Sequence, residues 1–143
     1  MAIEIRILNR GDRRALDQVA PGVFDNAVDP RLADEFLADP RHHMVAAIED
    51  GVIVGFASGV HYVHPDKPAE LFINEVGIAP SHHRLGLGKA VVTSLLEVGR
   101  RLGCREAWVL TDRENTAAMA LYASAGGEEA VDASIMFNFP LNR

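Results

Sequence analysis

Residues 76–89 read Val76-Gly77-Ile78-Ala79-Pro80-Ser81-His82-His83-Arg84-Leu85-Gly86-Leu87-Gly88-Lys89. The residues that lead into this stretch, from Leu71 to Ile78, are mostly β-branched or bulky and apolar, which favours a strand. After it, Val91, Leu95 and Val98 recur at spacings of four and three, which predicts a helix. The stretch therefore predicts a strand, a sharp turn and a glycine-bearing entry into a helix. The unpaired N–H groups and the positive dipole end of such a helix attract phosphate groups.

The composition of the chain is that of an ordinary globular protein. It has 143 residues, of which 48% are hydrophobic and 24% charged. This predicts one domain over residues 1–143, large enough to bury a proper core. The apolar runs all fall short of the roughly 20 residues that cross a bilayer, and Glu4 and Arg6 interrupt what would be the apolar region of a signal peptide. We therefore expect a cytoplasmic protein with no membrane partner.

Charge and cysteine content exclude several classes of function. The net charge of −6 argues against nucleic acid as the main partner and is compatible with a cationic substrate. The single cysteine, Cys104, excludes an intrachain disulfide and a cysteine-rich metal site. The pairs His42-His43 and His82-His83 lack further ligands at metal-site spacing, and neighbours on an extended segment point apart. We therefore expect no metal.

Short patterns predict the remaining elements. Ile3, Ile5 and Ile7 alternate with charged residues, as in a half-buried strand. Asp29-Pro30 is typical of a helix start, and Asp50-Gly51 predicts a two-residue hairpin turn. The element order is β-α-α-β-β-β-α-β-α-β-β, a mixed α/β sheet of six to seven strands flanked by about four helices, with a right-handed parallel crossover between residues 69 and 111. The predicted strands are residues 3–8, 44–49, 52–62, 69–78, 107–111, 129–133 and 134–139, and the predicted helices are residues 13–19, 31–38, 86–102 and 115–125.

Two motifs of this chain together resemble the GCN5-related N-acetyltransferase (GNAT) superfamily. Its acetyl-CoA-binding signature is a Gln or Arg, two residues, Gly, one residue, then Gly or Ala, and the window here is His83 to Gly88. The strand end from Val76 to Pro80 is similar too. The family's later order of Asn, Ala, an apolar residue with Tyr, and Gly is matched by Asn115, Ala118, Leu121-Tyr122 and Gly126. Two positions depart from the pattern: His83 replaces the Gln or Arg, and Gly127 stands where an aromatic residue often follows.

The resemblance implies a GNAT fold and direct transfer of acetyl from acetyl-CoA, as co-substrate, to an amine. The backbone from Arg84 to Lys89 would hold the pyrophosphate. The N–H of Ile78, freed where the strand splays at a bulge, would bond the acetyl or pantetheine group as an oxyanion hole does, and Gly77 is a plausible bulge residue. The implied cofactor-binding positions are Val76, Gly77, Ile78, His83, Arg84, Leu85, Gly86, Leu87, Gly88, Lys89, Asn115, Ala118 and Tyr122.

Two side chains are candidates for moving protons. A carboxylate must take a proton from the amine, since a protonated amine cannot attack. Glu75 matches the acidic position of many family members, and an ionisable residue in an apolar central strand is costly without a role. Alternatively Glu75 only binds substrate or makes a structural pair. Tyr122 matches the tyrosine that protonates the leaving thiolate; it lies seven residues after Asn115, so the two share a helix face.

Alternatives remain open for the helix residues. Tyr122 could be a buried tyrosine bonded to the backbone, and Asn115 could contact CoA or cap its helix. A non-catalytic acetyl-CoA-binding module is a different class of function, against which the presence of both Glu75 and Tyr122 argues.

The sequence says least about which amine accepts the acetyl group. Phrases such as Ala46-Ala47, Val54-Gly55 and Glu128-Glu129 look most like GNAT-type aminoglycoside 3-N-acetyltransferases. A small cationic amine would suit a cleft lined by acidic residues. Acetylation of another small amine or of a protein N-terminus is the alternative, and a homodimer is common in the family. The available acidic residues are Asp25, Asp29, Asp34, Glu35, Glu75, Asp112, Glu128, Glu129 and Asp132.

Overall fold

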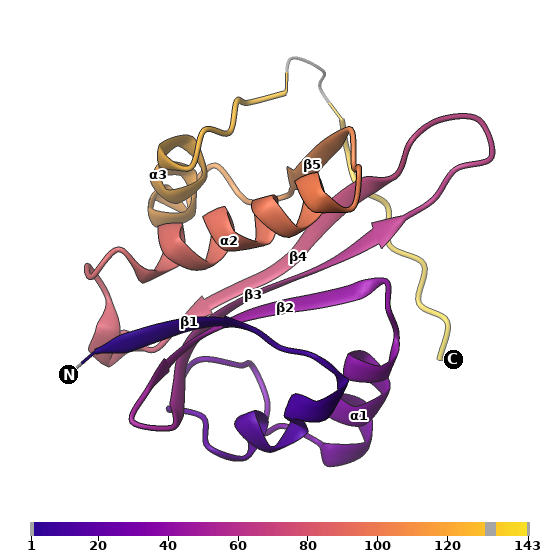
Figure 1. Ribbon diagram of the computed structural model, residues 1–143. Coiled ribbons are helices and arrows are strands. Elements are labelled where there is room, and N and C mark those ends of the chain that lie inside the picture. The colour runs from indigo at the N-terminus through magenta and orange to yellow at the C-terminus, as the bar shows by residue number, and fades with distance from the viewer. Residues whose placement is uncertain (1, 131–133, 143) are drawn as a thin grey trace.

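Five strands form one sheet, in the spatial order β1-β2-β3-β4-β5 (Figure 1). The structure is a computed structural model that describes residues 2–130 and 134–142. Neighbouring strands are antiparallel except β4 and β5, which are parallel. The strands are β1 (Ile3–Ile7), β2 (His42–Glu49), β3 (Val52–Tyr62), β4 (Glu70–Ile78) and β5 (Glu106–Val109).

Helices cover both faces of this sheet. The helices α2 and α3 lie on one face, and η1 and α1 lie on the other (Figure 1). Asp29 caps α1, because its carboxylate accepts the N–H groups of Arg31 and Leu32, and Pro30 occupies the first turn. The described helices are η1 (Arg10–Asp17), α1 (Pro30–Ala38), η2 (Pro80–His82), α2 (Leu87–Arg101) and α3 (Thr116–Ser124).

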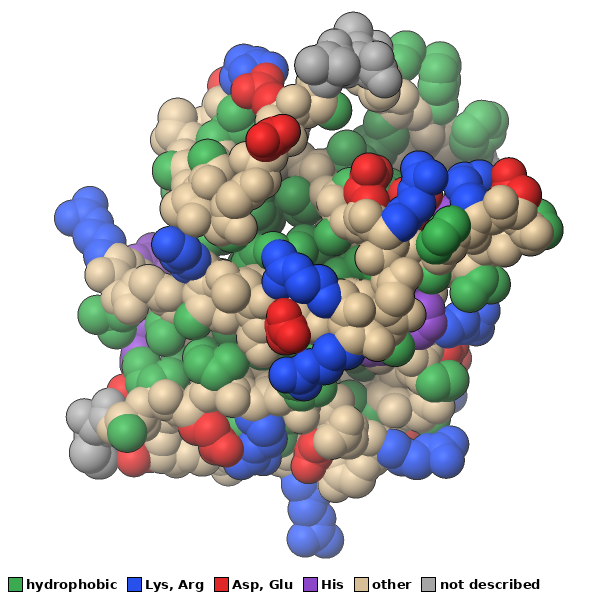
Figure 2. Space-filling model, turned by 45° about the horizontal axis from the view of Figure 1, so that its top comes forward, with side chains coloured by type: hydrophobic (Ala, Val, Ile, Leu, Met, Phe, Trp, Pro, Cys, Tyr) green, Lys and Arg blue, Asp and Glu red, His purple; other side chains and the backbone are tan. Residues whose placement is uncertain are grey.

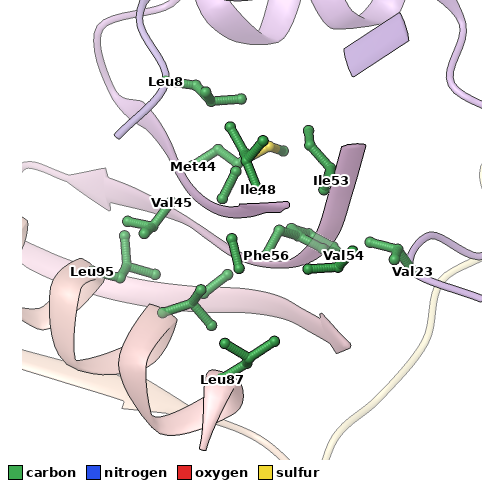
Figure 3. Packing of buried hydrophobic residues seen from close by; sticks show 14 of the residues in the cluster. Leu8, Val23, Met44, Val45, Ile48, Ile53, Val54, Phe56, Leu87 and Leu95 are labelled. Carbon is green, nitrogen blue, oxygen red and sulfur yellow. The ribbon is translucent and has the colours of Figure 1, made fainter. Parts of the chain in front are cut away.

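The core lies on both faces of β2 and β3. Val45 of β2 points toward Leu95 of α2, whereas Met44 and Ile48 point to the opposite face, toward Leu8 (Figure 3). Val45 and Leu95 are fully buried, and Phe56 of β3 is 2% exposed. Full burial of one such side chain is worth about 1.5–3 kcal/mol. The sheet is therefore anchored most firmly at its centre, next to β4.

The predicted order of elements is confirmed as far as α3, including the β4-α2-β5 crossover. The first helix is a 3-10 helix that begins earlier than predicted, at Arg10. The two C-terminal strands were wrong for residues 129–130 and 134–139, which form no strand; residues 131–133 lie outside the described residues. An alternating pattern makes a strand only where a hydrogen-bonded neighbour is available, and the described residues pair no further strand with β5.

Candidate active site

Among the described residues, the second half of β4 has a strand neighbour on one side only. Within the described residues β5 pairs with β4 from Glu70 to Ile73, whereas β3 pairs with it as far as Ile78. The N–H of Ala79 donates to Val54 of β3 at 2.8 Å. Because successive residues of a strand point their polar backbone groups to opposite sides, the N–H and C=O of Ile78 face away from β3. The His83 ring donates to that Ile78 oxygen at 3.1 Å, which agrees with this orientation.

The bulge in β4 lies at Asn74. Ser58 of β3 pairs with Glu75 and Gly59 pairs with Ile73, so Asn74 is the extra residue. Gly77 was wrongly predicted as the bulge, because it sits in regular register opposite Phe56. Its missing side chain serves a close approach instead: a Cβ there would overlap the carbonyl oxygen of Val23 and lie 2.9 Å from the Phe56 ring.

The turn before α2 has the geometry of an anion-binding helix start. Arg84 and Gly86 adopt left-handed backbone angles, with φ of 66° and 76°. Gly86 is the N-cap of α2, and its carbonyl oxygen accepts the first hydrogen bond of the helix, from the N–H of Ala90 at 3.1 Å. The N–H groups of residues 87–89 therefore have no acceptor within the helix. The arrangement, with the positive dipole end of α2 and the exposed Arg84 side chain, suits a pyrophosphate.

The signature glycine Gly88 brings α3 against α2. A Cβ on Gly88 would lie 3.2 Å from the side chain of Leu121, so the two helices approach closely at this point. Asn115 caps α3, because its side-chain oxygen accepts the N–H of Ala118 at 3.0 Å. This contact favours capping over the alternative in which Asn115 binds CoA.

Tyr122 follows Leu121 on α3 and is half-buried, packed against the core. Burial raises the pKa of its hydroxyl above the usual value, so the group stays protonated at neutral pH. The N–H of Gly127 donates to the Tyr122 carbonyl at 2.9 Å, and a Cβ on Gly127 would come equally close to that oxygen. The glycine at this position therefore keeps the chain tight against the end of α3.

A small cavity of about 210 Å³ opens at Glu75, on the side of the sheet crossed by the loop that follows η1. Its polar side chains are Asp25, Asn74 and Glu75, and the stacked rings of Phe24 and Phe56, 4.2 Å apart, form its wall. Glu75 is exposed to this cavity and not sealed in the core. The expectation that it lies in an apolar environment was therefore wrong. The bulge residue Asn74 was not foreseen, because a bulge leaves no local trace in the sequence.

A larger and shallower groove, of about 590 Å³, runs along the outer side of α2. It begins at Gly86 and Lys89, beside the anion-binding turn, and ends at Arg100. Figure 2 looks onto this side of the molecule, where basic side chains gather over α2. The groove thus extends the positive environment of the turn, whereas the Glu75 cavity is separate and acidic.

Histidine and cysteine side chains take structural positions. His42 packs on Phe36, with ring centroids 5.2 Å apart, while the neighbouring His43 stacks on His61 at 5.0 Å. The two adjacent histidines therefore point apart, as predicted. Cys104 is partly buried against the core, and burial raises the pKa of its thiol. Among the described residues no group of three His, Cys, Asp or Glu side chains could hold a metal ion, and no helix could span a membrane.

Comparisons with known proteins agree with this geometry. The model of the Acetyltransferase (GNAT) family matches residues 13–126. The N-alpha-acetyltransferase RimI of Mycobacterium tuberculosis is 31% identical over 126 residues, 87% of this chain and 77% of the relative. The aminoglycoside N(6')-acetyltransferase type 1 of Salmonella typhimurium is 31% identical over 137 residues, 89% of this chain and 92% of the relative.

A solved structure extends the likeness to three dimensions. The aminoglycoside N-acetyltransferase AAC(6')-Iy, in complex with CoA, superposes with a TM-score of 0.75 at 27% identity, covering 98% of this chain and 96% of the other. The family match, the parallel β4-α2-β5 crossover and the turn before α2 all support one family assignment. The chain belongs to the GNAT acetyltransferase family and is an N-acetyltransferase.

Proposed function

We propose that this chain transfers the acetyl group of acetyl-CoA to a primary amine of an aminoglycoside or a closely similar cationic amine. The observation that carries the proposal is the acidic cavity at Glu75. It opens on β4, and the same strand presents the Ile78 N–H at the edge that faces away from β3. A cavity with two carboxylates, Asp25 and Glu75, suits an acceptor that carries several ammonium groups. The single domain would act in the cytoplasm, where acetyl-CoA is found.

The residues of the turn fit the diphosphate of acetyl-CoA. Donors at the N-terminus of α2 and the left-handed Arg84 and Gly86 offer converging N–H groups, and Lys89 adds charge. Bound there, acetyl-CoA would supply the activated acyl group. The Ile78 N–H would donate to the acyl oxygen, which becomes more negative as the amine attacks. His83 holds this part of the strand through the Ile78 carbonyl, so its departure from the family pattern has a use.

Glu75 and Tyr122 would move the protons. Glu75 would take a proton from the acceptor ammonium, directly or through water, so that the neutral amine attacks. Its exposure to the cavity leaves the carboxylate in reach of a soluble amine. Tyr122 would give its proton to the departing thiolate, and the raised pKa of its hydroxyl keeps that proton available. The amine nitrogen ends bonded to the acetyl carbon, and CoA leaves as a thiol.

The position of acetylation on an aminoglycoside is a finer question. The short phrases of the sequence predict a 3-N amine. The aminoglycoside relatives reported above are named for the 6' amine instead. A 6' amine is therefore the better candidate.

A protein N-terminus is the second candidate acceptor, because the RimI relative is an N-alpha-acetyltransferase of similar identity. An α-amine at the end of an extended peptide carries one positive charge, so it would engage Glu75 but leave Asp25 unpaired. The acidic cavity thus favours a polyamine over a peptide, although both classes deserve a direct comparison.

The test is a thiol-release assay with acetyl-CoA and a graded set of acceptors. The set holds two aminoglycosides that differ only in a 6' amine or a 6' hydroxyl, a linear polyamine, and a peptide with a free N-terminal alanine. We expect turnover with the 6'-amino compound and loss of most of it with the 6'-hydroxyl compound. Equal turnover of these two would remove the 6' assignment. Turnover of the peptide alone would replace the aminoglycoside proposal with the second candidate.

A further inference from the structure

An extra residue in β4 brings two neighbouring side chains to one face of the sheet. Before the bulge Ile73 pairs with Gly59, and after it Glu75 pairs with Ser58. Ser58 and Gly59 are consecutive on β3 and so point to opposite faces. Glu75 therefore lies on the face opposite to Ile73, which is also the face of Asn74. The lining of the cavity at Glu75 contains both side chains, in agreement with this register.

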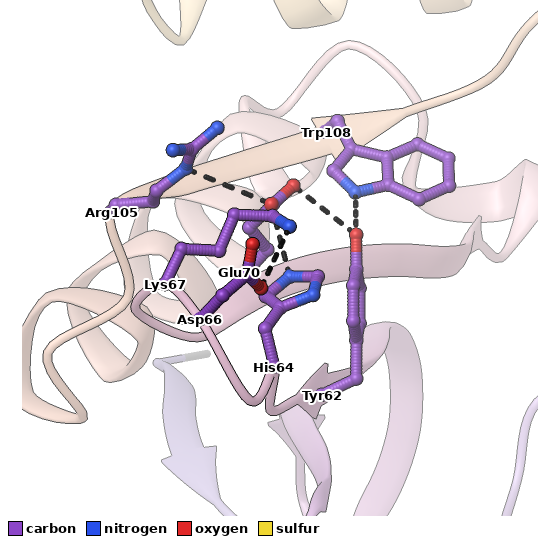
Figure 4. Close-up of polar contacts among 7 residues, drawn as sticks. All are labelled: Tyr62, His64, Asp66, Lys67, Glu70, Arg105 and Trp108. Atoms are coloured by element: carbon purple, nitrogen blue, oxygen red, sulfur yellow. Dashed lines mark hydrogen bonds and ion pairs between the residues drawn. The ribbon is translucent and has the colours of Figure 1, made fainter.

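The register of β3 and β4 is fixed on the N-terminal side of the bulge. Tyr62 pairs with Glu70 at the start of β4, and its hydroxyl donates to the Glu70 carboxylate at 3.2 Å (Figure 4). The Trp108 indole N–H donates to the same hydroxyl at 2.6 Å, and His64 Nε2 lies 3.2 Å from the carboxylate. Glu70 is 9% exposed, so these contacts are shielded from water. A strand pair held at this point cannot slip by one residue to absorb Asn74.

The register is also fixed at the bulge and after it. A Cβ on Gly59 would lie 2.7 Å from a backbone oxygen of β4, so the two strands approach closely beside the bulge. Farther along, Gly77 pairs with Phe56, and a Cβ on Gly77 would overlap the Val23 carbonyl oxygen. Because the strands are held on both sides, Asn74 stays in place as the extra residue that faces the cavity.

The polar side chains of the cavity differ in what they can bind. Asp25 and Glu75 carry carboxylates, whose oxygens accept hydrogen bonds and suit the N–H groups of an acceptor amine. Among the described side chains that line the cavity, Asn74 alone carries N–H donors, because an amide has an NH₂ group beside its oxygen. Asn74 and Glu75 are both exposed, so their polar atoms are open to a ligand. The cavity can therefore hold an oxygen atom at Asn74, next to an amine at Glu75.

The wall of the cavity is apolar. Phe24 stacks on Phe56, and because Phe56 is 2% exposed, the half-buried Phe24 ring is the one that presents its surface. The hydrocarbon frame of an acceptor leaves water when it packs there, which favours binding. An amine and an oxygen held together on a saturated frame describe an amino sugar, whereas a linear polyamine has no oxygen to offer to Asn74.

We propose that Asn74 determines acceptor specificity: its amide donates an N–H to an oxygen on the carbon next to the one that bears the amine. Asn74 and Glu75 are consecutive, with Cα atoms about 3.8 Å apart, so they suit two groups separated by one C–C bond. A ring ether oxygen only accepts hydrogen bonds, so an amide can serve it and a carboxylate cannot. In an aminoglycoside the ring oxygen has this position relative to the 6' amine. The inference rests on the proposed function and goes beyond it by naming the oxygen that the site recognises.

The test compares two acceptors of one shape. Aminomethyl-tetrahydropyran has its ring oxygen next to the carbon that bears the aminomethyl group, and aminomethyl-cyclohexane has a CH₂ group in place of that oxygen. Thiol release at low acceptor concentration gives kcat/KM for each compound, and their inhibition constants against an aminoglycoside acceptor give a second measure of the same preference. Because the two amines differ in basicity, the decisive quantity is the change of this preference between protein variants.

Asn74→Leu removes the amide and keeps a side chain of similar size. It should lower the preference for the oxygen compound by roughly three- to tenfold, the effect of one hydrogen bond in a site open to water. Asn74→Asp keeps the size and an acceptor oxygen but removes the N–H donors, so it should lose the preference as well. Asn26→Leu is the matched control, because Asn26 is exposed and follows Asp25 without lining the cavity. Circular dichroism checks that each variant stays folded.

Failure of this inference is distinguishable from failure of the proposed function. Glu75→Gln should slow both compounds alike, because it acts on the amine and not on the oxygen. If Glu75→Gln loses turnover while both Asn74 variants keep the wild-type preference, the role of Asn74 is wrong and the proposed function stands. An equal loss of preference in Asn26→Leu would also overturn the role of Asn74. A wild type that acetylates no cyclic amine, aminoglycosides included, would remove the proposed function and this inference with it.

Discussion

His82 Nε2 lies 2.9 Å from Glu49 Oε1, and this contact joins the end of β2 to η2, directly before the anion-binding turn. On the other side of the ring, Ser81 Oγ lies 2.8 Å from His82 Nδ1. Both ring nitrogens are therefore engaged, which fixes the orientation of the imidazole. The His82 and Glu49 side chains are 17% and 27% exposed, so the contact is partly shielded from water. The contact with Glu49 thus holds the segment that leads into the turn of residues 83–89 against the sheet.

We predict that Glu49→Ala raises the KM for acetyl-CoA about fivefold, the effect of losing one partly buried hydrogen bond, with kcat within twofold of wild type. Glu49→Gln keeps an oxygen acceptor for His82 and should recover part of the loss. Glu4→Ala is the matched control, because it removes an ion-paired carboxylate from β1 at the surface. Steady-state kinetics at saturating acceptor measures both constants. An equal KM for acetyl-CoA in Glu49→Ala and the control would show that Glu49 does not hold the turn in its binding geometry.

Loss of either proposed proton carrier should lower kcat and leave the affinity for CoA nearly unchanged, the reverse of the effect expected for Glu49→Ala. Glu75→Gln and Tyr122→Phe should each lower kcat by about 10²–10³-fold, the usual cost of removing a general acid or base, while the affinity for CoA measured by calorimetry stays nearly the same. Asp25→Asn tests the other cavity carboxylate and should raise the KM of a polyamine acceptor more than it lowers kcat. Undiminished turnover in both Glu75→Gln and Tyr122→Phe would remove these two residues from the chemistry.

The pH profile of Tyr122 adds a second check. Because burial raises the pKa of this hydroxyl from its ordinary value, ionisation of Tyr122 cannot limit the rate at neutral or mildly alkaline pH. We therefore expect kcat of the wild type to hold up to about pH 9 once the acceptor amine is neutral. A loss of kcat that begins near pH 8 and disappears in Tyr122→Phe would contradict the role of a protonated tyrosine.

Local patterns were sufficient to predict the turn that precedes α2. Glycines and a helical stripe act within a few residues of one another, so Gly86 and the start of α2 could be read from the sequence. Asn115 was ambiguous because one amide can cap a helix or bind a ligand, and the contact with Ala118 N–H favours the first. The bulge at Asn74 and the role of Gly77 could not be predicted, because both depend on how β3 and the Val23 loop meet β4.

The prediction of two C-terminal strands was wrong for a related reason. Residues 134–139 were predicted as a strand, but a sequence pattern states which side chains share a face and not which strand they pair with. Within the part of the chain that the structure describes, the segment from 134 to 139 has no such partner.

The stacked pair of His43 and His61 makes stability depend on pH. Burial and the facing His61 ring lower the pKa of His43 to about 4, whereas an unfolded chain has the ordinary value near 6.5. Between these values the unfolded chain binds a proton that the folded chain does not, so stability falls as the pH drops through this window.

We expect the free energy of unfolding to fall more steeply between pH 7 and pH 4 in the wild type than in His43→Gln. The difference should be on the order of 1 kcal/mol, because the half-exposed ring is screened by solvent. Urea denaturation at a series of pH values measures it. His42→Gln, at the exposed neighbouring ring, is the control and should keep the wild-type slope. Identical slopes in wild type and His43→Gln would show that the pair has no such effect.

Gly77 connects the stability of the sheet to the shape of the acceptor cavity. A methyl group at this position would overlap the Val23 carbonyl oxygen and press on the Phe56 ring. The loop from Val23 to Asp25 must then lift from the sheet, because a backbone oxygen cannot rotate aside. Gly77→Ala should therefore lower the free energy of unfolding by about 1–3 kcal/mol and, since the same loop walls the cavity, raise the KM of the acceptor while the KM of acetyl-CoA changes little.

Gly11→Ala provides the matched control, because a Cβ at Gly11 meets nothing within 4 Å. It should leave both KM values and the unfolding free energy close to wild type. Chemical denaturation and bisubstrate kinetics on the same preparations separate the two effects of Gly77→Ala. If the variant were destabilised with an unchanged acceptor KM, the Val23 loop would not shape the acceptor site, and the cavity at Glu75 would lose its proposed role in choosing the amine.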